Sequence, residues 1–356
     1  NRMIMHSIPL MDHNELMETA KSILEKSDSF SKQAITNIIT VYEKIMKEQT
    51  NAFKPNGNSD FFGARDFYAL IKNQATHSEV SSGQSLECYL RNFGGLDHND
   101  YRKQLNKILI EVLNKTKSEV FREMKKWNPV MCVERNLMEK KRGQSSDDLM
   151  VSRHCMVISE KYYSWQLLLE YNILNFDQVF LFRSYFPQDK YSNITNYNQL
   201  NKIIDCMDTG KTVILHNLES IYESLYDMLN QRYQKRPSGN IYCRVALGTE
   251  SRDCYVHENF KCIVVVQKED AHSPNMPIAF LSRFEKQFIS YRNSLPININ
   301  RHVKYARTVL MEAFKVNLSD LFCGYCEDTI FSSLLYLATQ KSMQTDYIKD
   351  DEKKEQ

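Results

Sequence analysis

The sequence predicts an α/β fold in which helices flank a parallel sheet, with all-helical regions before and after it. Three observations support this prediction. Apolar residues recur at helical spacing in the first part of the chain, short apolar runs alternate with helical patterns from about residue 146, and helical spacing returns after residue 300. Because strands that alternate with helices bury both faces of a sheet, the middle part is expected to hold a parallel sheet.

The first part, residues 1–145, is expected to be helical. Apolar stripes predict helices over residues 13–26, 35–46, 65–73 and 101–114. Asp12 and Glu15 have the spacing of a capping box at the first of these helices. The charged, polar segment 139–148 contains one glycine, so we interpret it as a loop and domain boundary.

The middle part, residues 146–300, alternates between two kinds of pattern. Strands are predicted over residues 150–159, 178–182, 212–215, 262–266 and 288–291, and helices over residues 162–171, 198–207 and 218–233. Residues 301–343 begin another helical region. Residues 344–356 are charged and poor in apolar side chains, so a frayed tail is expected there.

Composition restricts the class of protein. A formal net charge of +2 gives no reason to expect nucleic acid or a membrane surface as a partner. No apolar run approaches the roughly 20 residues that a membrane-spanning helix requires. The nine cysteines are odd in number and mostly lie in apolar runs, which favours reduced thiols in the cytoplasm over a disulfide framework. The chain begins at Asn1 without a leader pattern, so we interpret it as a piece of a longer protein.

The segment 260–291 is the most informative one. A buried strand, a short helix that ends in Ser-Arg-Phe-Glu and a second strand follow one another, as in the back half of an AAA+ core, which has a P-loop NTPase-like parallel sheet. In such cores the arginine after the helix, here Arg283, faces a neighbouring nucleotide. A fixed guanidinium there can offset the charge that develops on a transferred phosphoryl group. The alternative is a local pair with a carboxylate such as Glu285.

Gly210-Lys211-Thr212 matches the end of a phosphate-binding loop, but its context is reversed. The full pattern needs a glycine where Asp205 stands. A phosphate loop leads from a strand into a helix, so that the helix N-terminus meets the phosphates. Here the segment ends a helix and opens a strand, which favours Gly210 as a helix C-cap.

The positions that would bind Mg²⁺ and activate water are also altered. The strand expected to carry the Walker B carboxylates ends in His216-Asn217, and Glu219 comes two residues later. The first strand is followed by Glu160-Lys161, with no glycine. We therefore expect residues 146–300 to be a degenerate AAA+ core that binds no cofactor and does not hydrolyse ATP.

Two further motifs leave alternatives open. Arg65 opens a helix in the first part, where the lid of an AAA+ unit carries an arginine (sensor 2) that reaches the nucleotide of its own core; the alternative is a charge that decorates a helix start. Cys323 and Cys326 have the spacing of zinc ligands, but no second pair follows, so no metal site is expected.

Several blocks together resemble one family. They are FFGARDFYALIK (61–72), LRNFGG (90–95), FPQDKY (186–191), CMDTGKTVILHNLESIYESLYDMLNQRY (206–233), VHENFKCIVV (256–265) and PIAFLSRFEK (277–286). They are similar to the mysterin family of giant AAA+ RING-finger E3 ubiquitin ligases.

The resemblance implies that residues 1–145 are the helical lid end of an upstream AAA+ unit, that the degenerate core follows, and that residues 301–343 start its own lid. Arg2 would lie near the end of the upstream core, where an inter-subunit arginine sits, so Arg2, Arg65 and Arg283 are the nucleotide-sensing candidates. ATP and Mg²⁺ would belong to the upstream core, and zinc to a RING outside this chain. The partners implied are neighbouring AAA+ units of the same chain, a ubiquitin-conjugating enzyme and ubiquitination substrates.

We therefore expect a segment that completes an ATPase ring and relays nucleotide state without being catalytic itself, in a parent protein that is a ubiquitin-protein transferase with ATPase activity. The alternatives are a segment of a dynein-like motor and a non-catalytic interaction scaffold.

Overall fold

The computed structural model describes residues 11–24, 31–52, 61–76, 85–96, 99–139, 152–184, 192–274, 276–294, 297–315, 318–326 and 328–337. Its first part consists of helices α1 (His13–Leu24), α2 (Lys32–Ala52), α3 (Ala64–Thr76), α4 (Leu86–Asn92), α5 (Asn99–Leu113), α6 (Lys117–Lys126) and α7 (Pro129–Met138). The predicted capping box is present, because the Glu15 amide donates to Asp12 Oδ1 at 2.8 Å and the Asp12 amide to Glu15 Oε2 at 2.9 Å.

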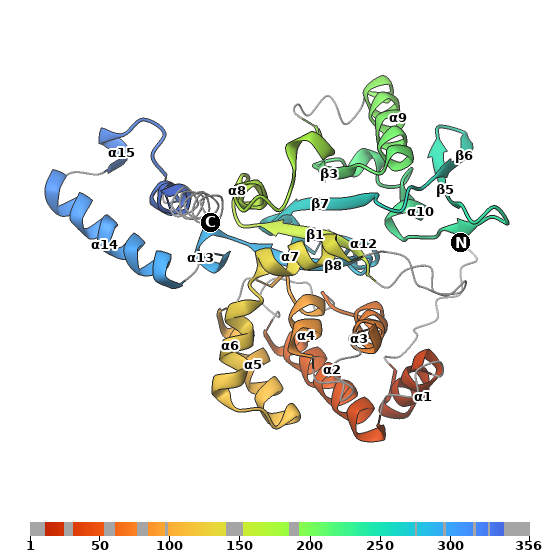
Figure 1. The fold of residues 1–356 in the computed structure, drawn as a ribbon, viewed down its shortest axis with the longest axis horizontal. Coiled ribbons are helices and arrows are strands. Elements are labelled where there is room, and N and C mark those ends of the chain that lie inside the picture. Colours follow the sequence, from red (N-terminus) through yellow and green to blue (C-terminus); the bar gives the residue numbers. More distant parts are fainter. Residues whose placement is uncertain are drawn as a thin grey trace, which may run out of the picture.

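A five-stranded parallel sheet follows. Its strands are β1 (His154–Ser159), β2 (Val179–Arg183), β3 (Thr212–His216), β7 (Lys261–Gln267) and β8 (Phe284–Ile289), in the order β2-β3-β7-β1-β8. The connections carry α8 (Leu167–Glu170), α9 (Asn193–Thr209), α10 (Tyr226–Leu229), α11 (Lys268–Ala271) and α12 (Ile278–Leu281). In Figure 1 helices α1–α6 lie beyond β8, below the sheet, and α9 lies near β3, above it. The predicted AAA+ α/β fold class is confirmed.

The strands β1, β3 and β7 are buried on both faces, so their side chains alternate between two apolar clusters. Met156 and Ile158 of β1 belong to the larger cluster, which also holds the cores of α1–α5 and α9. Cys155 and Val157 belong to the second cluster, with Trp165, α7, α8 and the C-terminal helices. A continuous core therefore joins the N-terminal helices to the sheet.

The structure corrects two predicted elements. The helix expected over residues 218–233 is broken into a 3₁₀ turn (Glu219–Ile221), the one-turn helix α10 and a left-handed residue, Gln231. The last strand begins at Phe284 and not at Phe288, so that Glu285 and Lys286 are buried strand residues.

An antiparallel sheet of β4 (Gln234–Lys235), β5 (Ile241–Leu247) and β6 (Glu250–Tyr255) is inserted before β7. After β8 come α13 (Tyr291–Ser294), α14 (Ile297–Phe314), α15 (Leu318–Leu321) and a helix over residues 329–337. Helix α14 extends away from the sheet, opposite the end that carries β5 and β6 (Figure 1). No helix within the described ranges is long and apolar enough to cross a membrane. The predicted tail, residues 344–356, lies outside the described residues.

Candidate functional site

Parallel strands bring all their carboxyl ends to one edge of the sheet, which is where ligands bind in open α/β folds. We call this the carboxyl edge, and the opposite one the amino edge. Four strands end at the carboxyl edge in Ser159, Arg183, His216 and Gln267. A nucleotide held by this core would have to bind there.

His216 occupies the place of the first Walker B carboxylate and is fully buried. Its Nε2 lies 3.5 Å from Gln267 Nε2, and its Nδ1 is buried without a partner. Burial, assisted by the positive charge of Arg183, lowers the pKa of His216 to about 4. A neutral imidazole cannot replace a carboxylate that balances the charge of Mg²⁺.

Aromatic side chains pack around His216. The ring of Tyr162 lies 5.0 Å and that of Trp165 6.4 Å from its imidazole. The Arg183 guanidinium stacks on the ring of Tyr162, 4.1 Å from its centre. These contacts join the residues after β1 to the ends of β2 and β3.

The turn after β1 does not form a phosphate loop. The Ser164 amide donates to the Lys161 carbonyl at 2.9 Å, and the Lys161 amide donates to Ser164 Oγ at 3.1 Å. The Lys161 ammonium is 3.1 Å from Asp328 Oδ2, at the start of the 329–337 helix. The ammonium of Lys161, the one lysine of this turn, is therefore in an ion pair with the Asp328 carboxylate.

The other two Walker B candidates do not restore the site. Asn217 has a left-handed backbone (φ 56°) that turns the chain out of β3, and Glu219 is exposed at the start of the 3₁₀ turn. No pair of carboxylates comes together at the carboxyl edge among the described residues. The side chains present do not fit Mg-ATP.

Gly210 and Lys211 lie at the amino edge. Gly210 adopts a left-handed conformation (φ 73°) at the end of α9, and its amide donates to the Cys206 carbonyl. This is the predicted helix C-cap. Strand β3 then leads away from Lys211, which puts Lys211 at the end of the strand remote from the nucleotide position.

Arg283 also lies at the amino edge, directly before β8. Its guanidinium stacks 4.5 Å from the ring centre of Tyr226 and 5.5 Å from that of Phe280. Its Nε is buried without a partner. The alternative of a pair with Glu285 is wrong, because Glu285 is bound by Arg91 at 2.9 Å.

Arg65 reaches the same place from the first turn of α3. Its Nη1 donates to Asn230 Oδ1 at 2.9 Å, next to α10. A third guanidinium, that of Arg232, lies 5.1 Å from the Tyr226 ring. Arg65, Arg232 and Arg283 form what we call the arginine cluster. Burial, and then the positive charges of Arg65 and Arg232, lower the pKa of Arg283, so the three cations are close enough to repel one another.

The neighbouring residue of Arg65 anchors α3 to the sheet. Asp66 is fully buried and accepts hydrogen bonds from Lys286 Nζ at 3.1 Å and from Arg153 Nη1 at 2.8 Å. The Gly63 amide donates to its other oxygen at 2.9 Å. Burial lowers the pKa of Lys286 to about 8 against the opposing effect of Asp66. Two cations on one carboxylate fix the start of α3, and with it Arg65, relative to β8.

A second buried network joins α4 to β8. Arg91 is fully buried and pairs with Glu285, Glu87 and Glu139. Although burial alone would lower the pKa of Arg91, these carboxylates hold it well above its ordinary value. The backbone also approaches closely, because a Cβ added to Gly94 would lie 2.5 Å from the Lys286 carbonyl oxygen. The helices before the sheet are therefore tied to β8 by charge and by contact.

The remaining candidates lie elsewhere. Arg2 is outside the described residues. Cys323 is exposed, whereas Cys326 Sγ lies 3.2 Å from Tyr163 Oη and 3.4 Å from Thr329 Oγ1. Within the described part of the chain, no group of three or more side chains that could ligate a metal is found.

Sequence reasoning missed Arg153, Arg232 and Lys286. Arg153 lies near the start of the strand predicted over residues 150–159 and Lys286 shortly before the one predicted over 288–291, where a charged residue is ordinarily a solvated strand end. Their partner Asp66 is distant in sequence, so no local signal marked them.

Comparisons with known proteins agree with this geometry. Residues 145–295 match the family model described as the RNF213 AAA domain. The chain is 29% identical, over 94% of its length, to the E3 ubiquitin-protein ligase RNF213 of Homo sapiens and likewise to that of Mus musculus. It is 28% identical, over 90% of its length, to the E3 ubiquitin-protein ligase rnf213-beta of Danio rerio. The chain spans 6% of the length of each of these relatives.

The resemblance to mysterin, another name for RNF213, is confirmed. Residues 145–295 match an AAA domain of the RNF213 type, and the homology supports an internal AAA segment of an RNF213-like protein.

Proposed function

We propose that this segment completes a nucleotide site that belongs to a preceding AAA+ core and hydrolyses nothing itself. Arg65, at the start of a lid helix, and Arg283, before β8, both contact the phosphates held by that core. In this way the segment closes one joint of an ATPase ring and transmits its nucleotide state to the rest of the chain.

The observation that carries the proposal is that the side chains of Arg65 and Arg283 lie close to each other beside α10. They were candidates for separate reasons, and they lie in different parts of the fold. Both nevertheless reach α10, with Arg65 on Asn230 and Arg283 on Tyr226. The only carboxylate found near the cluster in the described residues is that of Asp227, 3.9 Å from Arg232. Three guanidinium ions beside one carboxylate keep a net positive charge, which suits a polyphosphate.

The position of the cluster indicates whose phosphates it would contact. Strands of five to seven residues separate the two edges of the sheet by roughly 16–23 Å. Arg283 therefore cannot reach a nucleotide at the carboxyl edge of its own core. A cation fixed at the amino edge can serve only a nucleotide that is presented from outside.

The rigid joint supports the relay. Asp66 is held by Lys286 and Arg153, and Arg91 by Glu285, so α3 and β8 move together. A displacement of Arg65 on nucleotide release would thus be passed to the whole sheet. In the parent protein, we propose, ATP and Mg²⁺ bind upstream, a zinc-binding RING engages a ubiquitin-conjugating enzyme, and ubiquitin is transferred to substrates in the cytoplasm.

The test is ATP hydrolysis by the full-length protein with Arg65→Ala, Arg283→Ala and both changes. We expect each single variant to lower kcat, by about 10³-fold for Arg283, since an arginine that stabilises transferred phosphate is worth roughly 10³–10⁵. If the two guanidinium groups act on one phosphate, the double variant loses less than the product of the two single losses.

Arg244→Ala is the matched control, because Arg244 is an exposed arginine on β5 of the same domain. It should leave kcat unchanged. Full hydrolysis by both single variants, in a protein that hydrolyses ATP, would reject the proposal and leave Arg65 as the decoration of a helix start.

A further inference from the structure

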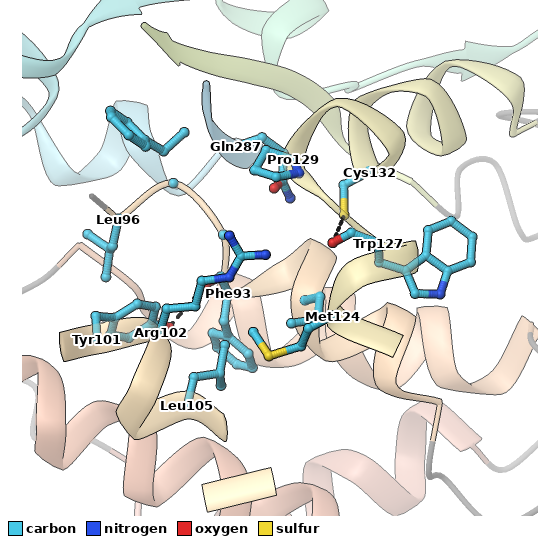
Figure 2. A pocket seen from close by; sticks show the side chains of 14 residues that line it. Phe93, Leu96, Tyr101, Arg102, Leu105, Met124, Trp127, Pro129, Cys132 and Gln287 are labelled. Atoms are coloured by element: carbon cyan, nitrogen blue, oxygen red, sulfur yellow. Dashed lines mark hydrogen bonds between the residues drawn. The ribbon is translucent and has the colours of Figure 1, made fainter. Parts of the chain in front are cut away.

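A cavity of about 70 Å³ lies where the N-terminal helices meet β8, on the far side of the joint from the arginine cluster. Its walls come from α4, α5, the segment between α6 and α7, and β8. Most of them are apolar or aromatic: Leu90, Phe93, Leu96, Tyr101, Leu105, Met124, Trp127 and Phe288. Figure 2 shows these side chains around an open centre.

One cation points into this centre. Figure 2 shows the Arg102 guanidinium directed toward the middle of the cavity, on the side of Gln287. Arg102 is half-buried; this partial burial lowers its pKa, and no carboxylate among the described residues pairs with it. The other arginines at this joint are paired: Arg91 with three glutamates and Arg153 with Asp66. A guanidinium that is partly withdrawn from water and has no carboxylate beside it is stabilised by an anion that meets it.

Polar groups that could complete an anion site are few. Gln287 is buried and its amide nitrogen donates to the Arg91 carbonyl at 2.9 Å. The Tyr101 hydroxyl donates to the Phe93 carbonyl at 3.0 Å. The cavity therefore offers one positive charge, one planar fork of donors and a surround in which apolar side chains alternate with polar groups.

This composition selects among anions. A phosphate or sulfate would bring four oxygens and up to two charges, and most of those oxygens would face apolar walls without donors. A carboxylate presents two oxygens in one plane, which the guanidinium fork matches. The volume is about half that of an engineered apolar cavity that holds benzene, which limits the ligand to about four or five non-hydrogen atoms.

We propose that this cavity is a binding site for a short-chain carboxylate of two or three carbons, with Arg102 holding the carboxylate and Phe93, Leu105 and Met124 surrounding the alkyl group. The inference is independent of the arginine cluster. A bound carboxylate neutralises Arg102 and fills the joint between α5 and β8, so it strengthens the attachment of the N-terminal helices to the sheet.

Calorimetric titration of the chain with propionate tests the proposal. Propionamide, which has the same shape without charge, and inorganic phosphate are titrated in parallel at one ionic strength. We expect saturable one-to-one binding of propionate in the millimolar range, with at least about tenfold weaker binding of propionamide and phosphate.

Arg102→Met keeps most of the side-chain volume and removes the charge, and it should weaken propionate binding at least about tenfold. Met124→Phe keeps Arg102 and fills the cavity, and it should also abolish binding. Arg122→Met makes the first change at an exposed arginine of α6 and should bind like the parent chain. Circular dichroism checks that each variant is folded.

The proposal is overturned if the parent chain shows no saturable binding, if Arg102→Met binds propionate as tightly as the parent, or if propionamide binds equally well. Equal binding to the amide would mean that the cavity recognises shape alone.

Discussion

The two edges of the five-stranded sheet differ in what their polar residues do. At the carboxyl edge, His216 is neutral and Arg183 stacks on Tyr162, so these described side chains offer no charge to balance Mg²⁺. At the amino edge, Asp66 and Lys286 are paired and buried, and the arginine cluster stands beside them. Aromatic packing around His216 fills the carboxyl edge. The other edge keeps charges that attach the N-terminal helices and face outward.

This contrast teaches that the two edges of one AAA+ core can use their polar residues differently. Under the function proposed above, the core needs the polar residues of its amino edge and not those of its carboxyl edge. Charged residues should therefore matter most for stability where helices meet β8, and least where ATP would have bound.

The largest expected effect is the loss of Arg91. Arg91→Met leaves Glu285 buried with only Asn136 as a hydrogen-bond donor, and strips one cation from Glu87 and Glu139. Removing one partner of a buried pair costs about 3–5 kcal/mol, so the free energy of unfolding in urea should fall by that amount. Arg135→Met is the control, because Arg135 is 43% exposed on the same Glu87, and it should cost about 0–1 kcal/mol. Similar losses for both would show that burial does not distinguish the two arginines.

Asp66 and Lys286 give an asymmetric pair of variants. Asp66→Asn leaves two cations, Lys286 and Arg153, at one buried amide, and should cost about 3 kcal/mol. Lys286→Met leaves Asp66 paired with Arg153 and bonded to the Gly63 amide, so it should cost only about 1 kcal/mol. Urea unfolding of both variants measures the difference. A larger loss for Lys286→Met would contradict the network as described.

The fold was predictable for the strands that are covered on both faces of the sheet. The runs that became β1, β3 and β7 were predicted to within a few residues, because a strand covered on both faces is apolar throughout. Strand β8 begins with Phe284-Glu285-Lys286-Gln287, which reads as a surface segment. Its charges are buried only because Arg91 and Asp66, distant in sequence, neutralise them, and no local pattern shows such partners.

The site was predictable only as separate residues. The motifs marked Arg65 and Arg283, but nothing in the sequence said that both reach α10. The stripe over residues 218–233 has helical spacing, yet the chain breaks there to place Tyr226 and Asn230 beside the two arginines. Periodicity records which residues are buried, and it does not record how the chain turns between them.

The burial of His216 at the carboxyl edge should make the free energy of unfolding depend on pH. The folded-state pKa of His216 is about 4, below the ordinary value of about 6.5, so the unfolded chain binds the proton more readily. Its contribution to stability is therefore present above pH 6.5 and is lost as the pH falls from there toward 4. Between pH 7 and 5 the loss should be about 2 kcal/mol. Urea unfolding of His216→Phe over the same range should lack this part of the decline. A variant whose pH profile matches the parent would show that folding does not shift the pKa of His216.

The smallest expected effect concerns the segment that most resembles a phosphate loop. The parent chain should bind no Mg-ATP in a calorimetric titration, since the carboxyl edge has neither a glycine loop nor paired carboxylates within the described residues. Lys211→Ala should leave this result unchanged and should alter the free energy of unfolding by no more than about 0.5 kcal/mol. Lys211 is partly exposed at the amino edge, where its backbone caps α9 and its side chain faces no phosphate site.

Gly210→Ala is the informative contrast. Its positive φ and a Cβ only 2.4 Å from His257 Nδ1 make it destabilising while nucleotide binding stays absent. Micromolar ATP binding that Lys211→Ala abolishes would restore the phosphate-loop interpretation and, with it, a nucleotide at the amino edge. The distinction drawn here between a carboxyl edge that would hold a nucleotide and an amino edge that would not would then be wrong.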